Sequence, residues 1–246
     1  MSTTLELVHA GDPGLPVAIL RMDDGKANAF NPTMLASFSA SLDAAERSEA
    51  KALVIVGRPG FYSGGLDLKA LPALSTADKA RVLRLYGEVL LRVFTFRTPT
   101  VTALTGHAIA GGALMALATD VRVAVDNAAR FGITEVAIGL PVPTFGLLAA
   151  RAAMAPHVLT EMVLQARAIM LRDALPRGIV RSLHPEDGVV DAAIALGGEL
   201  AKLPGAAHQH TKRGLWAADI ERIVEGMDAE IHTFVELFEQ RFPPAS

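Results

Sequence analysis

Residues 100–118 read TVTALTGHAIAGGALMALA, and this stretch decides which kind of fold the chain adopts. No Lys, Arg, Asp or Glu occurs across residues 98–119, a length that would also suit a membrane span. However, residues 100–105 alternate as a buried strand does, Gly106 and His107 break that pattern, and residues 113–118 are typical of a short buried helix. The stretch therefore predicts a strand, a turn and a helix inside a protein core.

Strand, loop and helix follow one another three times around this stretch. Residues 52–57 are wholly apolar, as in a strand covered on both faces, and a glycine-rich loop at 57–68 comes next. Ser75 then caps a helix that is predicted to run to about Phe96, and residues 121–125 form a further strand. Repeated units of this kind predict an α/β fold with a mostly parallel sheet and right-handed crossovers.

The chain before these units predicts a hairpin and a helix. Residues 5–8 and 17–21 have strand patterns, and the turn residues Gly11-Asp12-Pro13-Gly14 join them. Asn31 is a good capping residue, and proline suits the first turn that follows it. The apolar positions of this helix predict that it buries Met34, Leu35, Phe38 and Leu42.

The C-terminal part of the chain is predicted to be helical, because strand patterns fade after about Thr144. One apolar stripe continues over six turns, with charged residues opposite it. Its members are Ile220, Ile223, Val224, Met227, Ile231, Phe234, Val235, Phe238 and Phe242. With a mean hydropathy of +0.34, the stripe favours an oligomer in which partner subunits cover it. The alternative is that the stripe covers the chain's own core. We interpret residues 1–190 as the core and 191–246 as a helical region of the same domain.

Composition excludes several classes of function. The 246 residues are 51% hydrophobic, which is ample for a core, and a net charge of −3 with 5% aromatic residues is unsuited to nucleic acid. The chain has no cysteine, so disulfides, thiolate metal sites and a cysteine nucleophile are excluded. The N-terminal residues contain no targeting pattern, and we expect a cytoplasmic protein that does not bind membranes.

The sequence lacks most of the familiar motifs of functional sites, and two glycine-rich segments are the candidates that remain. There is no dinucleotide fingerprint and no phosphate-binding loop, and His208 and His210 are interpreted as surface residues rather than metal ligands. His107 is interpreted as a core histidine bonded to backbone. Residues 63–69 and 106–112 each follow a buried strand and leave backbone N–H groups uncovered. Two such groups at one point would form an oxyanion hole, whereas the alternative is that the glycines only allow tight turns.

At these segments the sequence resembles the crotonase family, the enoyl-CoA hydratase/isomerase superfamily. Residues 26–30 (KANAF), 61–69, 106–120 and 131–140 match the family's early loop, its two oxyanion loops and its acidic loop, in that order. The resemblance extends to the terminal helices. It implies a spiral of repeated ββα units with a helical C-terminal layer. It also implies acyl-CoA substrates with no separate cofactor or metal, and assembly as a homotrimer or a dimer of trimers.

The resemblance also implies roles for individual residues. The N–H groups of Leu66 and Gly111 would be the oxyanion donors, and Glu135 would be the catalytic carboxylate. The positions that would contact the CoA thioester are Lys26, Ala27, Ala29, Gly64, Gly65, Leu68, Lys69, Gly112 and Leu114. Family hydratases have a second catalytic glutamate three residues after the second oxyanion glycine, and here that residue is Leu114.

One carboxylate is enough to move a double bond, because the group that removes an α-proton can return it at the γ-carbon. We therefore expect a Δ3-Δ2-enoyl-CoA isomerase of fatty-acid breakdown, most like the monofunctional isomerases. Ile133, Val136, Ile138 and Leu140 are expected to desolvate Glu135 and raise its pKa. The alternatives are a hydratase or another single-carboxylate reaction of the family, and an acyl-CoA-binding homologue without activity. For Glu135 itself, the alternative is an ordinary carboxylate on a surface loop.

Overall fold

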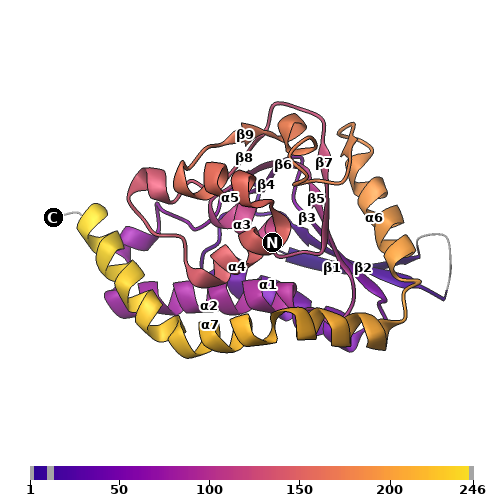
Figure 1. Cartoon of the computed structure of the whole chain (residues 1–246), viewed down its shortest axis with the longest axis horizontal. Helices are drawn as coiled ribbons and strands as arrows, with labels where there is room; N and C mark the ends of the chain where they lie inside the picture. Colours follow the sequence, from indigo (N-terminus) through magenta and orange to yellow (C-terminus); the bar gives the residue numbers. More distant parts are fainter. Residues whose placement is uncertain (1–2, 10–13, 244–246) are drawn as a thin grey trace.

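The computed structural model describes residues 3–9 and 14–243, which fold into two sheets surrounded by helices (Figure 1). The strands are β1 (Thr3–His9), β2 (Pro16–Met22), β3 (Ala52–Val56), β4 (Gly60–Ser63), β5 (Thr100–Leu104), β6 (Gly106–Ile109), β7 (Val121–Val125), β8 (Arg130–Gly132), β9 (Ile169–Met170) and β10 (Leu183–His184). The helices are α1 (Pro32–Arg47), α2 (Thr76–Phe94), α3 (Gly111–Leu117), α4 (Thr144–Ala153), α5 (Pro156–Leu159), α6 (Val189–Leu200) and α7 (Gly205–Arg241). Short helical turns lie at η1 (Leu71–Ala73), η2 (Val136–Ile138), η3 (Thr160–Leu164) and η4 (Leu171–Ala174).

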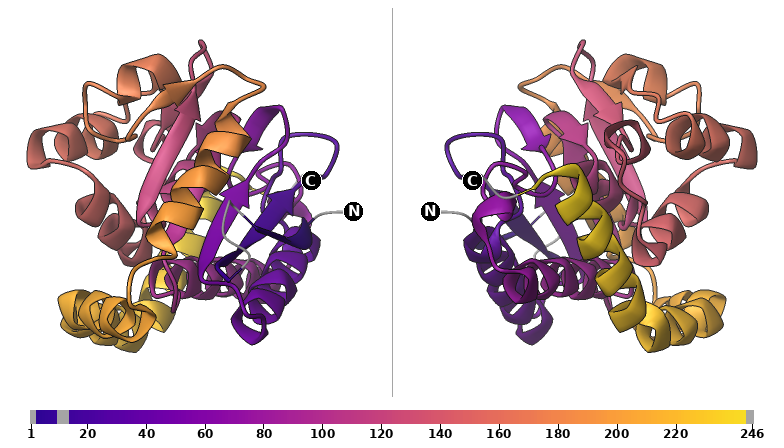
Figure 2. Two further views of the ribbon diagram at one scale, coloured as in Figure 1. Left: turned by 90° about the vertical axis from the view of Figure 1, so that its right-hand side faces the viewer. Right: turned by 90° about the vertical axis from the view of Figure 1, so that its left-hand side faces the viewer.

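The larger sheet has the strand order β1-β2-β3-β5-β7-β10. Only β1 is antiparallel to its neighbour, so the predicted parallel sheet and the predicted N-terminal hairpin are both confirmed. Residues 11–13 of the predicted turn lie outside the described residues. All five residues of β3 and of β5 are buried, as their apolar sequences predict. Helix α6 packs against β2, β3, β5 and β7 and covers this sheet (Figures 1 and 2).

A second sheet, in the order β4-β6-β8-β9, occupies the region where the residue pattern predicts loops. In particular, Gly106 and His107 do not end a strand, because they begin β6, which pairs in parallel with β4 and β8. A Cβ at Gly106 would lie 2.0 Å from the carbonyl carbon of Gly60. Gly106 therefore allows two strands to approach closely, and the prediction of a turn from the residue pattern is wrong. The resulting pairs of strands agree with the ββα units that the resemblance implies.

The helix starts are confirmed at both predicted caps. Asn31 accepts a hydrogen bond from the Met34 N–H at the start of α1, and Ser75 accepts one from the Asp78 N–H at the start of α2. Helix α1 buries the four apolar residues predicted for it. Helix α2 ends at Phe94, slightly before the predicted end, where Thr95 donates through its hydroxyl to the Leu91 carbonyl at 2.8 Å.

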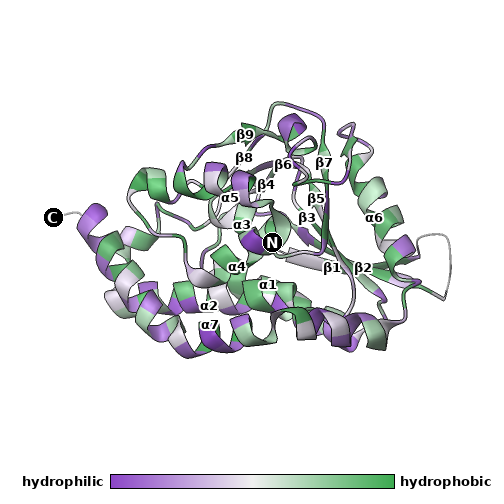
Figure 3. Cartoon of the chain, viewed as in Figure 1, coloured by the Kyte–Doolittle hydropathy of each residue, from purple (hydrophilic) through white to green (hydrophobic). Residues whose placement is uncertain are grey.

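Helix α7 is the longest helix, and it lies along α2 and α4 of its own chain (Figures 1 and 2). The stripe residues Ile223, Met227, Ile231, Phe234, Val235 and Phe238 are buried there. Val224 is 58% exposed, so its assignment to the buried stripe is wrong. Because this chain covers most of the stripe itself, the stripe does not support an oligomer. Figure 3 shows that hydrophilic and hydrophobic residues are interspersed along α7.

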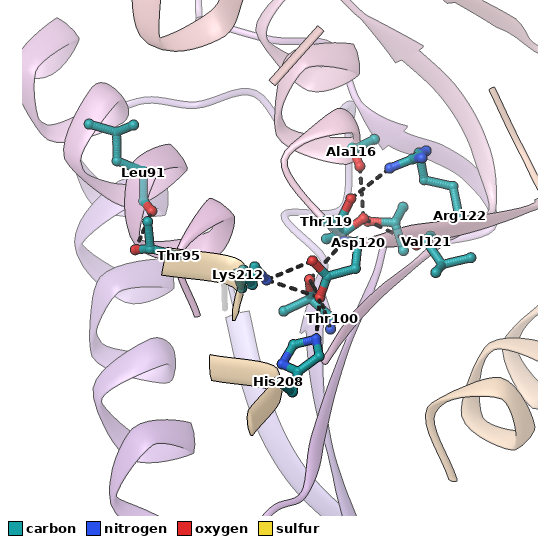
Figure 4. Close-up of polar contacts among 11 residues, drawn as sticks. Leu91, Thr95, Thr100, Ala116, Thr119, Asp120, Val121, Arg122, His208 and Lys212 are labelled. Carbon is teal, nitrogen blue, oxygen red and sulfur yellow. Dashed lines mark hydrogen bonds and ion pairs between the residues drawn. The ribbon is translucent and has the colours of Figure 1, made fainter. Parts of the chain in front are cut away.

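A polar cluster fixes the first half of α7 to the core (Figure 4). Lys212 of α7 lies 2.8 and 2.9 Å from the two carboxylate oxygens of Asp120, which follows α3. Asp120 also accepts from the N–H and the hydroxyl of Thr100, at 2.8 and 3.0 Å. His208, one turn earlier on α7, lies 4.0 Å from the same carboxylate. Asp120 thus joins the C-terminal helix to the start of β5.

Two further findings concern the expected absences. None of the helices in residues 3–9 and 14–243 combines the length and the hydropathy that crossing a bilayer requires. Within the same residues, no three His, Asp or Glu side chains gather closely enough to hold a metal ion. His107 accepts a hydrogen bond from the Arg130 N–H at 3.0 Å through Nδ1, which agrees with its interpretation as a backbone-bonded histidine. It is only partly buried, so its interpretation as a core residue is wrong.

Candidate active site

Six of the twelve residues implied by the resemblance line one pocket. It is bounded by the loop after β4, the start of α3, the segment after β8, and one face each of α2 and α7. Its lining residues are Gly64, Leu66, Leu68, Leu83, Tyr86, Ala110, Gly111, Leu114, Glu135, Ile138, Leu140, Pro143 and Phe234. Of these, only Glu135 carries a charge. An apolar pocket with a few convergent polar groups is typical of a binding site for an organic ligand.

Hydrogen bonds from Asn28 and Ser63 hold the first glycine-rich loop in place. The Asn28 side chain is buried and donates to the carbonyl groups of Met22 and Tyr62, at 3.0 and 3.1 Å. Ser63 donates to the Asn28 carbonyl at 2.7 Å and accepts from the Gly65 N–H at 3.1 Å. The loop that carries Leu66 is therefore fixed to the loop of residues 24–28.

The second glycine-rich loop contains an unusual backbone conformation next to Gly111. Ala110 has φ of 52° and ψ of −127°, a region that residues with a Cβ rarely adopt. Its own N–H donates to the Gly132 carbonyl at 2.8 Å, and the next peptide group starts α3 at Gly111. A backbone outlier of this kind is characteristic of functional sites, because the surrounding structure must hold it there.

The backbone N–H groups of Leu66 and Gly111 have no protein acceptor among the described residues, and both residues line the pocket. The two loops also touch each other, since a Cβ at Gly65 would lie 3.0 Å from the Gly111 nitrogen. Two uncommitted N–H groups on adjoining loops are suited to donate hydrogen bonds to an oxygen that becomes negatively charged. The N-terminus of α3 adds a favourable field at this point.

Glu135 is 7% exposed, so it is not a carboxylate on an open surface. Burial raises its pKa from an ordinary 4.5 to about 7, although the backbone N–H groups of Glu135 and Thr134 oppose the shift. Its Oε2 atom is buried and has no hydrogen-bond partner among the described residues. Ile133 and Leu140 are buried, whereas Val136 is 43% exposed, so the expectation that Val136 desolvates Glu135 is wrong.

Leu114 is fully enclosed, with 1% of its surface exposed, and its side chain reaches the pocket from the first turn of α3. A Cβ at Gly146 of α4 would lie 2.7 Å from Leu114 Cδ1, so glycine at that position makes room for the leucine. The position that carries a glutamate in the family's hydratases is therefore filled by a closely packed apolar side chain.

Most of the other residues implied to contact CoA lie around the pocket rather than in its wall. Gly64 and Leu68 line it, but Lys26, Ala27, Ala29, Gly65, Lys69 and Gly112 do not. Lys26 and Lys69 are exposed. Ala27 lies beside the pocket, because its carbonyl accepts from the Gly64 N–H at 2.8 Å. Gly112 has a packing role here, since a Cβ on it would lie 2.2 Å from the Ser63 carbonyl oxygen.

The residue pattern gave no indication of two aromatic members of the pocket, Tyr86 of α2 and Phe234 of α7. Each occupies an apolar position of an amphipathic helix and has the pattern of an ordinary core residue. The sequence pattern identifies Asn28 only as part of the early loop, yet it connects that loop to the loop of Leu66. Asn28 is buried and has a φ of 50°, and these two features indicate a role in fixing the loop. Neither feature can be recognised from the sequence alone.

Comparison with known proteins identifies the family of the chain. The model of the enoyl-CoA hydratase/isomerase family matches residues 15–242. The human mitochondrial enoyl-CoA delta isomerase 1 is 30% identical over 228 residues, which cover 91% of this chain and 75% of that protein. The crystal structure of human mitochondrial Δ3-Δ2-enoyl-CoA isomerase has a TM-score of 0.90 at 25% identity, covering 98% of this chain and 95% of that one. An enoyl-CoA hydratase of Mycobacterium ulcerans has a TM-score of 0.78 at 30% identity, covering 97% and 99%.

The fold is thus the crotonase fold. The chain belongs to the enoyl-CoA hydratase/isomerase family and is an enzyme of that family.

Proposed function

We propose that this enzyme is a Δ3-Δ2-enoyl-CoA isomerase, with Glu135 as its single acid and base. The observation that carries the proposal is that Glu135 is the one charged residue in the lining of the pocket. The other lining residues, which include Leu114, provide no second carboxylate. Water addition to a 2-enoyl thioester requires that water be activated and that the α-carbon be protonated. With leucine at the position of the second carboxylate, only one of these tasks has a carboxylate to perform it. The TM-score of 0.90 with the human isomerase also supports the proposal.

The reaction can be followed atom by atom. Glu135, ionised, removes a proton from the α-carbon of a 3-enoyl thioester, and the electron pair delocalises into the thioester carbonyl and the double bond. The N–H groups of Leu66 and Gly111 hold the oxygen of the resulting dienolate. Glu135 then returns the proton to the γ-carbon, which leaves the double bond between the α- and β-carbons. The apolar wall that includes Leu114 excludes water from the dienolate. No group other than these and the substrate is needed.

The proposal is tested by supplying the purified enzyme with 3-enoyl and 2-enoyl CoA thioesters in parallel. An isomerase converts the 3-enoyl thioester rapidly and hydrates the 2-enoyl thioester slowly or not at all. A hydratase shows the reverse preference. Binding of both thioesters without conversion of either indicates an acyl-CoA-binding homologue without activity.

The pH dependence of the isomerisation provides a further expected result. Glu135 must be ionised to remove the first proton, and its pKa is about 7. We therefore expect kcat/KM to fall about tenfold per unit of pH below that value and to level off above it. Initial rates between pH 5 and pH 9 provide the measurement. A rate already level from pH 5 upwards would exclude Glu135 as the base.

Replacing Leu114 by Glu is expected to raise hydration of a 2-enoyl thioester above that of the parent enzyme. The new carboxylate would lie one turn into α3 and would supply the missing group for water activation. Leu114→Gln, which has a similar shape but no base, is the matched control. If the rate of hydration rises equally in both variants, the new carboxylate is not what activates the water, and the explanation is wrong.

We also propose that the enzyme is a homotrimer or a dimer of trimers. Support comes from two large apolar side chains that are exposed on one hollow at the start of α7, namely Leu203 at 48% and Leu215 at 66%. Light scattering tests this, and a 25.9 kDa monomer at micromolar concentration would contradict it.

A further inference from the structure

Tyr86 is a pocket residue for which the proton transfers described above have no use. It lies in the middle of α2 with 2% of its surface exposed, and its hydroxyl donates to the Gly111 carbonyl at 2.6 Å. Gly111 also supplies one of the two uncommitted N–H groups. The hydroxyl of Tyr86 is therefore bound to the residue that carries one oxyanion donor.

The Tyr86 ring is held in position by its neighbours. Phe30 lies against it with ring centroids 5.4 Å apart, and Phe145 of α4 meets it nearly edge-on at 5.8 Å. The next residue, Gly87, allows Phe145 to come this close, because a Cβ there would lie 2.9 Å from Phe145 Cε1. Two rings from different elements thus fix the point from which the hydroxyl donates.

Tyr86 also fills the space beside the Gly111 α-carbon. A Cβ at Gly111 would lie 3.1 Å from the Tyr86 hydroxyl oxygen and 3.2 Å from Cζ. On the other side of Gly111, Ala110 is held in its rare conformation by the bond from its N–H to the Gly132 carbonyl. The peptide group between Ala110 and Gly111 is therefore fixed from β8 on one side and from α2 on the other.

We propose that Tyr86 is a positioning residue for the oxyanion hole. By holding the carbonyl group and the α-carbon of Gly111, it keeps the Gly111 N–H directed at the thioester oxygen. This inference rests on the proposed function only in that the enzyme binds an acyl thioester. It assigns to α2 a part in polarising the bound thioester carbonyl, because α2 holds in place the residue that carries one of the two donors.

The chemistry of the hydroxyl is consistent with positioning and not with proton transfer. Burial raises the pKa of Tyr86 well above its ordinary value, and the nearby charge of Glu135 acts in the same direction. Tyr86 therefore remains a neutral hydrogen-bond donor throughout the pH range of the reaction. Its proton is already committed to the Gly111 carbonyl.

The test uses Tyr86→Phe, which keeps the ring and removes the hydroxyl. We expect kcat for isomerisation to fall about tenfold, with KM changed less than twofold, because the loss concerns charge that develops after binding. The thioester carbonyl of a saturated acyl-CoA, isotope-labelled at that carbon, is also followed by infrared spectroscopy. Its shift to lower frequency on binding is expected to be smaller in the variant than in the parent.

Thr95→Val is the matched control, because it removes another hydroxyl that donates to a backbone carbonyl, at the far end of α2 (Figure 4). It is expected to change neither kcat nor the carbonyl shift, whatever it does to the melting temperature. Phe145→Leu is the second variant, because it keeps the hydroxyl and removes one ring that holds it. It is expected to reduce the carbonyl shift partially.

The outcomes separate this inference from the proposed function. If the parent enzyme binds the thioester and lowers its carbonyl stretching frequency but does not isomerise a 3-enoyl thioester, the proposed isomerase activity is disproved. The carbonyl shifts of the variants still decide the role of Tyr86. An unchanged carbonyl shift in Tyr86→Phe, or in Phe145→Leu if the first variant does not fold, overturns the positioning role alone. A parent enzyme that binds no acyl-CoA overturns both.

Discussion

Replacing Glu135 by Gln is expected to lower the rate of double-bond migration at least about a hundredfold while acyl-CoA affinity stays nearly unchanged. Glutamine has almost the same shape, so the pocket and its two N–H donors persist, but it cannot accept the α-proton. Single-turnover rates with a 3-enoyl thioester and calorimetry with a saturated acyl-CoA measure the two quantities. Glu88→Gln, a similar change at a half-exposed residue of α2, is the control. A variant that keeps most of its turnover would show that Glu135 is not the base.

The same substitution is expected to stabilise the fold at alkaline pH. Because the pKa of Glu135 is raised in the folded state, its contribution is most favourable below about 4.5 and is lost as the pH rises through about 7. The shift corresponds to roughly 3 kcal/mol, so Glu135→Gln should be more stable than the parent by up to that amount at pH 8. The difference should shrink towards pH 5. The free energies of unfolding of the parent and of Glu135→Gln, measured with denaturant at pH 5 and pH 8, show whether the ionised carboxylate destabilises the fold.

Replacing Asp120 by Ala is expected to lower the free energy of unfolding by about 3 kcal/mol. Lys212 is only 9% exposed, and its ammonium group would lose both carboxylate contacts while staying buried. The Thr100 N–H would lose its acceptor as well. Burial already lowers the pKa of Lys212, against the opposing effect of Asp120, so the charged lysine depends on this partner. The midpoint of denaturant unfolding is the measurement.

Two further variants test this explanation of the Asp120 effect. Asp228, also paired with an arginine but 86% exposed, provides the control, and Asp228→Ala should cost well under about 1 kcal/mol. Removing both charges in Asp120→Ala/Lys212→Met should recover part of the stability, because no buried ammonium group remains unpaired. A double variant less stable than Asp120→Ala would refute the unpaired charge as the cause.

Most of the larger sheet could be predicted from sequence, because its central strands are short apolar runs and helices α1 and α2 begin at recognisable caps. The prediction that the chain after about Thr144 is helical is wrong at β9 and β10, because strands of two residues are too short to show a pattern. The smaller sheet could not be predicted from the residue pattern. Its strands are only two to four residues long, and they pair through close approaches such as that of Gly106 to Gly60. A glycine that permits such an approach is indistinguishable in sequence from one that makes a turn. The apolar stripe of α7 was predicted correctly, but the surface that covers it was not. An apolar stripe shows that a helix face is buried and does not show whether its own chain or another subunit buries it.

The candidate site was predictable where its residues lie in contiguous loops. Leu66, Gly111, Leu114 and Glu135 line one pocket as their positions in the family pattern imply. Tyr86 and Phe234 were missed because each joins the pocket from a distant helix and has the pattern of a core residue. Ala110 was missed for another reason, since the backbone angles of an alanine have no signature in its identity.

The position of α7 also has a consequence for how the chain is made. The face of α2 that carries Val82 and Leu83 is covered by Phe234, Val235 and Phe238, and these emerge from the ribosome only after residues 95–204 and most of α7 itself have been added. At the usual pace of translation this takes on the order of ten seconds. During that interval the nascent chain displays an apolar surface beside an unfinished pocket. The pocket, which Phe234 helps to line, can therefore be completed only after this part of α7 has been made.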